Sequence, residues 1–548
     1  MASSQESVTW RDMPRKGQLC VLFLLRFAEP SVRSSASTYM YFQLKNLDPS
    51  LSSGQIVKQS ATVSTAYIIG QCLSSIWISE LADSPKCGRK GVLLLGTAAS
   101  IISSSLLGFT THFYQLVALW GLEGIFNGNV ATARTVITEI VVEKKYLSRA
   151  FVMTTMAATL STLLSPIMGG QLANLANTYP ERFGNNSFLK KFPYEPPALV
   201  NASMLFMTFL AIFFFLEETH PQKKSGRDIG LVISRKLVSC FKRRQEGSSY
   251  KSLDDEDSTE MEDVPFIKSE DADVEDSDNS GDEYDERKEG KKENRSISPI
   301  PQKNTAPPIL PLRRIFTQRF VLMLMVSAIH DCHIGAYTIL WTNFLSDPPA
   351  KGTHDSLPFR FSGGPGMTPS EIGLTLSIIG VCGLPIQFLV YPKVIHKLGA
   401  LRAWRLFMRG LPIIYSVAPF VALVSKLTKS NTSEHGQPPA VWLLIAVIQV
   451  TLIFCAVFVT PTAIMLVRLA CPHPSALART NSISYVASGA FRATGASIGA
   501  LIYSYGTSHS MTGLAFWVAA AVAVCVCCLA MACKEGDGHE IWLDGDEE

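Results

Sequence analysis

Ionisable side chains lie within stretches of the sequence that are otherwise apolar, and the first of these stretches carries three. Arg26, Glu29 and Arg33 are spaced by three and four residues, so a helix would place them on one face. Charged side chains are costly in lipid and are expected to face a protein interior or a cavity. A carboxylate between two arginines should stay ionised. The group predicts either a site for an anionic or zwitterionic solute or structural ion pairing.

A later apolar stretch carries a carboxyl group that could bind a proton. Glu123, Asn127 and Arg134 follow one stripe of the predicted helix. Glu123 could titrate because burial away from a cation disfavours the charged form of a carboxyl group. We therefore predict Glu123 as a proton-coupling residue, and Asn127 and Arg134 as residues that line a substrate cavity.

The second half of the chain offers a comparable set. His330 and His333 would share one helix face, and Asp331 lies between them in the sequence. A histidine–aspartate set can relay protons near neutral pH, so His330 and Asp331 are further proton-coupling candidates. The same residues could hold a divalent metal ion, but their spacing is a weak metal signature and we predict no metal site. His333 and Arg492 are predicted to line the cavity, where Arg492 could complete an anion site.

Twelve apolar stretches of helical length must position these side chains, each near the ~20 residues that a bilayer requires. They form two groups of six. Several contain glycine, proline or polar residues, as helices do when they pack on other helices or line a cavity. We place them at residues 18–42, 59–82, 91–111, 113–138, 149–174, 198–217, 319–345, 369–391, 403–425, 439–467, 480–504 and 510–533.

Composition excludes several classes of protein. Of the 548 residues, 47% are hydrophobic and only 17% are charged, which is too apolar for a soluble enzyme of this size. The net charge of +3 is small and gives no indication of a nucleic-acid partner. No phosphate-binding P-loop is evident, so ATP-driven pumping is disfavoured and a proton gradient replaces any cofactor.

Lysine and arginine in the short loops predict the orientation, with the N-terminus in the cytoplasm. The sequons at Asn185 and Asn431 then fall on the opposite side of the membrane and are glycosylation candidates. The predicted parts of the chain are a cytoplasmic N-terminus at 1–17, a six-helix bundle at 18–217, a cytoplasmic linker at 218–314, a second six-helix bundle at 315–533 and an acidic cytoplasmic tail at 534–548.

The linker at 218–314 is dense in Asp, Glu and Ser over residues 250–295, a composition that predicts disorder. It is either a solvated tether or a segment that kinases modify. Residues 230–244 alternate apolar and basic side chains, which predicts a helix on the membrane surface or a docking site for a targeting factor. A signalling role for the linker would make the chain a transporter-like sensor or scaffold.

The connection after the second apolar stretch concentrates charge. Its sequence, SELADSPKCGRK, supplies Asp83, Gly88, Arg89 and Lys90. A carboxylate at a helix end can pair with a guanidinium and with the N-terminus of a facing helix. We predict a conformational latch here, with Glu139 as the second partner of Arg89. The alternative is that these charges only anchor the loop at the lipid headgroups.

Five segments resemble the major facilitator superfamily, in particular its twelve-helix drug/proton antiporter branch and a fungal group related to the plant zinc-induced-facilitator-like carriers. They are RFAEP, ELADSPKCGRKGVLLLG, IFNGNVATARTVITEI, FRFSGGPGMTPSEIGLTLSIIGVCG and LVYPKVIHKLGALRAWRL. The resemblance covers both six-helix halves and implies an all-α membrane protein whose two bundles are related by a pseudo-two-fold axis. It also implies a monomer that gives alternating access to a site between the bundles.

The segment STLLSPIMGG resembles the antiporter motif G-x-x-x-G-P-x-x-G-G, with serine in the two leading glycine positions. Small residues permit close helix crossings and proline bends a helix, so the segment predicts either a hinge between the halves or simple close packing. The residues that correspond to the motif are Ser161, Ser165, Pro166, Gly169 and Gly170.

Together these features predict a secondary transporter, not an enzyme, that moves a small organic solute across a bilayer. The resemblance to antiporters favours proton-coupled export of a drug, toxin or secondary metabolite at the plasma membrane. The alternative is an importer of a metabolic or antibiotic precursor in a peroxisomal or vacuolar membrane, because fungal relatives of this kind include such carriers.

Overall fold

The structure is a computed structural model of the full chain, and part of the chain is described in it. The described residues are 13–141, 143–220, 223, 228, 230–234, 236, 311–349, 359–429, 436–473, 476–536 and 539–542.

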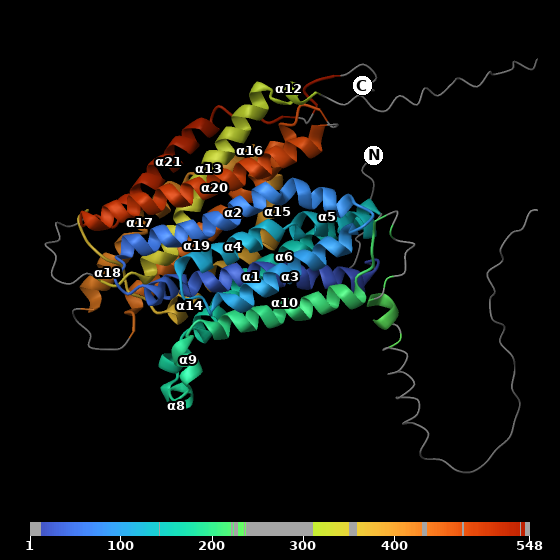
Figure 1. Ribbon diagram of the computed structural model, residues 1–548. Coiled ribbons are helices and arrows are strands. Elements are labelled where there is room, and N and C mark those ends of the chain that lie inside the picture. The colour runs from blue at the N-terminus through green and yellow to red at the C-terminus, as the bar shows by residue number, and fades with distance from the viewer. Residues whose placement is uncertain are drawn as a thin grey trace, which may run out of the picture. The chain divides into compact units, whose positions relative to one another are not determined.

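The first half of the chain forms long helices joined by short connections. Three small helices, α7 to α9, lie between the last two long ones (Figure 1). The elements are α1 (Lys16–Leu47), α2 (Ser53–Asp83), α3 (Gly88–Leu107), α4 (Phe113–Phe126), α5 (Asn129–Ile140), α6 (Lys144–Leu172), α7 (Leu175–Thr178), α8 (Pro180–Phe183), α9 (Ser187–Lys191) and α10 (Glu195–Phe215).

The second half repeats this pattern with more interruptions. The elements are α12 (Leu312–Ile315), α13 (Gln318–Ser346), α14 (Pro369–Pro385), the π-helix η2 (Ile386–Val390), α15 (Tyr391–Leu398), α16 (Ala400–Met408), α17 (Gly410–Val417), α18 (Phe420–Lys429), α19 (Pro439–Leu469), α20 (Leu477–Ser508) and α21 (Leu514–Ala530).

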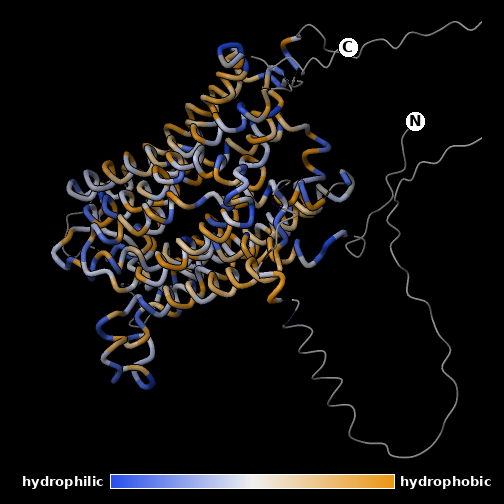
Figure 2. The backbone as a smooth tube through the Cα atoms, turned by 45° about the vertical axis from the view of Figure 1, so that its right-hand side comes forward, coloured by the Kyte–Doolittle hydropathy of each residue, from blue (hydrophilic) through white to orange (hydrophobic). Residues whose placement is uncertain are grey.

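The predicted all-α architecture is confirmed, since each of the twelve apolar stretches overlaps one or more of these helices. By length and composition alone, six of the described helices could cross a membrane, or eight if each of two bent pairs counts as one span. Large apolar side chains such as Leu73, Trp77 and Leu443 are about 70% exposed, which suits contact with lipid and not with water. Figure 2 shows apolar residues along the helices and hydrophilic ones around α8 and α9.

Three predicted spans are interrupted, each with a local cause. The stretch predicted at 113–138 breaks between α4 and α5 at Asn127 and Gly128. The stretch at 369–391 passes through η2 directly after Pro385, where the helix widens into i→i+5 bonding. The stretch at 403–425 bends by 42° between α17 and α18, and Pro419 lies in the connection between these two helices.

Two pairs of helices join the halves of the chain. α2 packs along α20, and α6 packs along α14, so each half contributes one member to each pair (Figure 1). The second pair approaches through glycine: a β-carbon at Gly170 would lie 2.3 Å from the carbonyl oxygen of Pro369, and one at Gly373 would lie 2.3 Å from that of Pro166. The motif at 161–170 therefore lies on the boundary between the halves.

Gly495 sets the distance between α20 and α13 within the second half. A β-carbon at this position would lie 1.9 Å from the backbone carbonyl oxygen of Cys332, which cannot move without displacing its helix. We expect Gly495→Ala to destabilise the protein by ~1–3 kcal/mol through overpacking, as a lower unfolding temperature in detergent. Gly121→Ala is the matched control, because a methyl group there meets no atom within 4 Å. Equal unfolding temperatures for the two variants would contradict this packing.

Candidate functional site

The ionic group predicted on the first long helix is present on α1. Glu29 is buried, and its Oε2 lies 3.9 Å from Nη1 of Arg26, one turn earlier. Pro30 follows within the helix, and the chain stays helical across it. Buried charges of this kind need partners from neighbouring helices as well, because one ion pair rarely offsets the cost of desolvating both groups.

The break between α4 and α5 supplies such a partner. Asn127 ends α4, and its side-chain amide donates a hydrogen bond to Oε1 of Glu29. The carbonyl oxygen of the same side chain accepts a hydrogen bond of 3.2 Å from Gln71 on α2. Interrupted helices at mid-membrane are the usual places where transporters expose polar groups to a ligand. Asn127 therefore ties α1, α2 and the α4–α5 break together.

Arg33 lies one turn beyond Glu29 and contacts two groups that face it. It donates to the hydroxyl of Tyr67, and its guanidinium lies 4.5 Å from the centre of the Tyr67 ring. Its Nη1 is 3.9 Å from Oε1 of Glu123, an atom with no hydrogen-bond partner. The Arg33 side chain is 31% exposed, whereas that of Glu123 is 1% exposed. The Arg33 side chain is therefore partly exposed, whereas the Glu123 side chain is buried.

Trp120 differs from the residue that the antiporter branch resembled by this chain usually carries. In that branch an arginine lies at this position, four residues before Gly124. Here the buried Trp120 packs edge-on against Tyr67, with ring centres 6.3 Å apart. The cation beside Tyr67 comes from Arg33 on α1 instead. Gly124 permits this arrangement, since a β-carbon there would lie 2.1 Å from the carbonyl oxygen of Tyr67.

The second half contributes a separate ion pair. Nη2 of Arg492 on α20 donates to Oδ1 of Asp331 on α13 at 2.6 Å, and Ser488 donates to the other carboxylate oxygen. The Arg492 side chain is 47% exposed. Tyr485 lies two turns earlier on α20, the helix that packs along α2 of the other half.

Arg134 lies on the far side of the helix break from Glu123. It is exposed, and it interacts electrostatically with Arg26. The stripe that the sequence predicted through Glu123 and Arg134 is interrupted by non-helical backbone at Asn127 and Gly128. Arg134 joins the exposed cations of the group and Glu123 its buried carboxyl groups.

The two histidines separate from their aspartate. His330 and His333 share a face as predicted, with Nδ1 and Nε2 of the two rings 3.2 Å apart, and His333 continues to the hydroxyl of Tyr415 at 3.2 Å. Asp331 points about 100° away around α13, because it is the next residue in a helix, and binds Arg492. Among the described residues, no group of three or more His, Cys, Asp or Glu side chains could hold a metal ion.

The predicted latch residues lie together at the C-terminal end of α2, which Asp83 ends. Arg89 donates to Asp83 and to the carbonyl oxygen of Ala82, and its Nη2 lies 3.2 Å from Glu139 on α5. These are the two carboxylates predicted as its partners. Lys90 instead pairs with Asp228, at 2.7 Å. Whether this group acts as a conformational latch stays a prediction.

Glu218 is a part of this group that the sequence did not single out. Its carboxylate accepts the backbone N–H groups of Arg89 and Lys90, at 3.0 and 3.2 Å, where α3 begins. An anion is favoured there because the first N–H groups of a helix lack backbone partners. Gly88 has φ +72°, and a β-carbon on it would lie 2.3 Å from Glu218. Two acidic residues directly after α10, Glu217 and Glu218, were the available signal.

The motif on α6 packs in two directions. Ser161 shares a hydrogen bond of 2.9 Å with Ser31 of α1, and a β-carbon at Gly169 would meet the carbonyl oxygen of Ser35. Ser165 is buried beside them, while Pro166 and Gly170 meet α14. Serine in place of glycine thus adds a polar contact between α6 and α1. A hinge role remains predicted.

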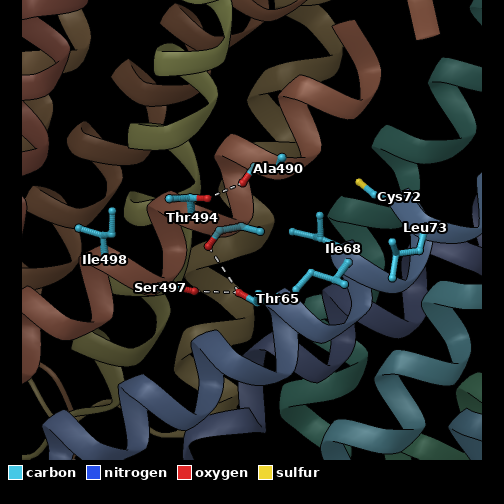
Figure 3. A pocket seen from close by; sticks show the side chains of 10 residues that line it. Thr65, Ile68, Cys72, Leu73, Ala490, Thr494, Ser497 and Ile498 are labelled. Carbon is cyan, nitrogen blue, oxygen red and sulfur yellow. Dashed lines mark hydrogen bonds between the residues drawn. The ribbon is translucent and has the colours of Figure 1, made fainter. Parts of the chain in front are cut away.

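A cavity of about 460 Å³ lies between α2 and α20 (Figure 3). Across it Thr65 bonds Ser497 at 3.1 Å, and the remaining lining is almost entirely apolar. Ile69, Leu73 and Ile498 on its rim are about half exposed or more. This cavity is distinct from the ionic group and borders the pair of helices that joins the halves.

Two further predictions concern modification and the linker. Asn185 is exposed in the turn between α8 and α9, as a glycosylated residue must be. Asn431 and all residues from 237 to 310 lie outside the described residues.

The helical fold and the ion pairs within its long helices are those of a polytopic α-helical transporter and not of an enzyme. The chain belongs to the Major Facilitator Superfamily, whose family profile matches residues 22–414. The similarity to the superfamily that the five sequence segments indicated is therefore confirmed.

Known relatives agree with this assignment. The major facilitator superfamily multidrug transporter mfsB of Aspergillus fumigatus is 26% identical, over 98% of this chain and 85% of its own length. The protein ZINC INDUCED FACILITATOR 1 of Arabidopsis thaliana is 22% identical, over 86% and 81% of the two chains. The crystal structure of a D-xylose–proton symporter matches the fold with a TM-score of 0.60 at 12% identity, covering 95% of this chain and 99% of the other.

Proposed function

We propose that this chain is a proton-coupled exporter of small organic solutes that carry an anionic group. One observation supports the charge of the solute. The most exposed charged side chains among the candidate residues are those of Arg33, Arg134 and Arg492, whereas those of Glu29 and Glu123 are 1% exposed. The side chains of Arg26, at 17%, and Asp331, at 13%, are mostly buried. Planar guanidinium groups bind carboxylates and phosphates through paired hydrogen bonds.

Glu123 supports the proton coupling. It is a buried carboxyl group whose Oε1 has no hydrogen-bond partner. This atom lies 3.9 Å from Nη1 of Arg33, the arginine to which the solute would bind. An anion bound to Arg33 and a negative charge on Glu123 would repel each other, so solute binding and proton binding are linked at this pair. Asp331 accepts hydrogen bonds from Arg492 and Ser488, and we assign it to the solute site with Arg492.

The direction and membrane are part of the same proposal. We place the Arg89 end of α2 in the cytoplasm, following the basic residues of the short loops, and the protein in the plasma membrane. The multidrug transporter among its relatives supports export of drugs, toxins or secondary metabolites. Glycosylation of Asn185 would follow from this orientation, and removal of N-glycans should then shift the protein on a gel. A fluorescent fusion should label the cell rim and not peroxisomal puncta.

Proteoliposomes test the coupling and the charge of the solute together. We expect vesicles with an acidic lumen to accumulate carboxyfluorescein, an organic anion, faster than vesicles without a pH gradient. A rhodamine cation of similar size is the matched control and should not accumulate. Flux of the anion that is equal with and without the gradient would contradict proton coupling, and accumulation of the cation alone would contradict the anionic preference.

A further inference from the structure

Asp347 is an acidic residue directly after α13, outside the membrane-spanning helices and absent from the candidate residues above. It is 2% exposed. Its Oδ1 accepts hydrogen bonds from the hydroxyls of Tyr41, at 3.4 Å, and Ser53, and its Oδ2 accepts one of 2.9 Å from Tyr503. A buried carboxyl group requires such donors, because burial without them costs more than the fold can offset.

Two of the three donors belong to the other half of the protein. Tyr41 lies on α1 and Ser53 begins α2, whereas Asp347 and Tyr503 belong to α13 and α20. Asn343, one turn before Asp347, adds a bond of 3.3 Å to Ser60 of α2. Val57 and Ala61 of α2 pack into the apolar cluster of Leu340 and Phe344. The halves are thus closed around Asp347 at the end of α2 opposite Arg89.

Transport by alternating access requires this end to open. Separation of the halves would take Tyr41 and Ser53 away from Asp347 and would admit water to the carboxyl group. The hydration of the Asp347 carboxyl group should therefore differ between the closed and open arrangements. We propose that Asp347 is a gating residue of the transport cycle, on which the two halves close, and that a proton on its carboxyl group favours closure.

The sign follows from burial. Burial raises the pKa of Asp347 in the closed arrangement, against the opposing effects of the Ser53, Tyr503 and Tyr41 hydroxyls and of Lys45. In an open, hydrated arrangement the pKa should return towards the ordinary value of about 4. A group whose pKa is higher when closed stabilises closure fully below its open-state pKa, and this stabilisation is lost as the pH rises through the raised value.

Among the described residues, the ionisable groups that interact with Asp347 are Tyr41, Tyr503 and Lys45. Tyrosine titrates near pH 10, so Tyr41 and Tyr503 keep their protons in weak acid. Lys45 also donates to the carbonyl oxygens of Pro49 and Leu51, which holds its ammonium group away from the contact between the halves. A pH response of the gate between weak acid and neutrality would therefore come from the carboxyl group.

Thiol labelling in lipid nanodiscs tests this gate without a known substrate and without assuming proton coupling. The full-length protein carries Val57→Cys as the reporter, since Val57 is fully buried between the halves, and a polar maleimide is the probe. Labelling is read at the reporter position by peptide mass spectrometry, because native cysteines such as Cys20 and Cys525 are exposed. Labelling is divided by that of exposed Thr111→Cys, which corrects for thiol ionisation. We expect the corrected rate to rise several-fold from about pH 4 to about pH 7.

Variants of Asp347 separate a gate from a structural contact. Asp347→Asn keeps a neutral, hydrogen-bonding side chain and should label slowly at every pH, whereas Asp347→Ala should label fast at every pH. A wild-type rate that does not change with pH, or a pH response that persists in Asp347→Asn, would overturn the proposal. These outcomes are independent of the proteoliposome result, because no solute or gradient is present.

Two tyrosines offer a matched pair of variants that should fold alike. Tyr41→Phe removes a hydrogen bond between the halves, so the reporter should label faster than in the parent protein. Tyr503→Phe removes a bond to the same carboxylate within one half, so labelling should change less. Equal effects of the two changes would overturn the role of the contact between halves.

Discussion

Glu123→Gln is expected to reduce strongly the accumulation of solute that a pH gradient drives, while solute exchange without a gradient continues. Glutamine keeps the shape of the side chain and cannot bind or release a proton. We expect gradient-driven accumulation to fall by ~5- to 150-fold, the range that ~1–3 kcal/mol of coupling between two binding sites spans. Counterflow of carboxyfluorescein between two sides of equal pH measures the step that should survive.

Glu195→Gln is the matched control for this change. Glu195 is a fully buried carboxyl group at the start of α10, next to Gly108 and away from Arg33. Its replacement removes the same charge from a buried place without touching the ionic group between the halves. A normal pH response in Glu123→Gln, or an equal loss in Glu195→Gln, would show that Glu123 has no special part in coupling.

Arg33→Ala is expected to weaken anion transport through binding. Arg33 is the half-exposed cation that contacts both Tyr67 and the vicinity of Glu123. Loss of a hydrogen bond from a charged donor costs ~1.5–3 kcal/mol, so the KM for carboxyfluorescein should rise ~10- to 150-fold.

Two further variants show whether charge or geometry matters at this position. Arg33→Lys keeps the charge but loses the planar group that stacks on Tyr67, so we expect an intermediate KM. Arg15→Ala removes an exposed arginine that pairs with Glu217 outside the ionic group, and it should leave the KM unchanged. Gel-filtration profiles confirm folding. An unchanged KM in a well-folded Arg33→Ala protein would remove Arg33 from the solute site.

Local pattern sufficed for much of the fold. The apolar stretches predict the long helices because a membrane span needs only length and composition, which neighbouring residues supply. The spacing of Arg26, Glu29 and Arg33 placed them on one face. The Asp83–Arg89 pair followed from a short loop between two helices, and Glu139 from its place at the cytoplasmic end of a later predicted helix. The break at Asn127 was missed, since Asn and Gly are tolerated in helices unless packing requires otherwise.

Contacts between helices distant in the chain were decided by the tertiary structure alone. Tyr67 and Gln71 were visible as polar residues one turn apart on α2, but nothing in their spacing indicates that they meet Arg33 and Asn127. Asp331 turned to Arg492 and away from its histidine neighbours because helix rotation, not sequence adjacency, sets which face meets α20. The sequence does not distinguish Asp347 from any other residue that follows a helix, because its partners Tyr41 and Ser53 belong to the other half. Sequence periodicity determines which side chains share a face, whereas the crossing of helices determines what each face meets.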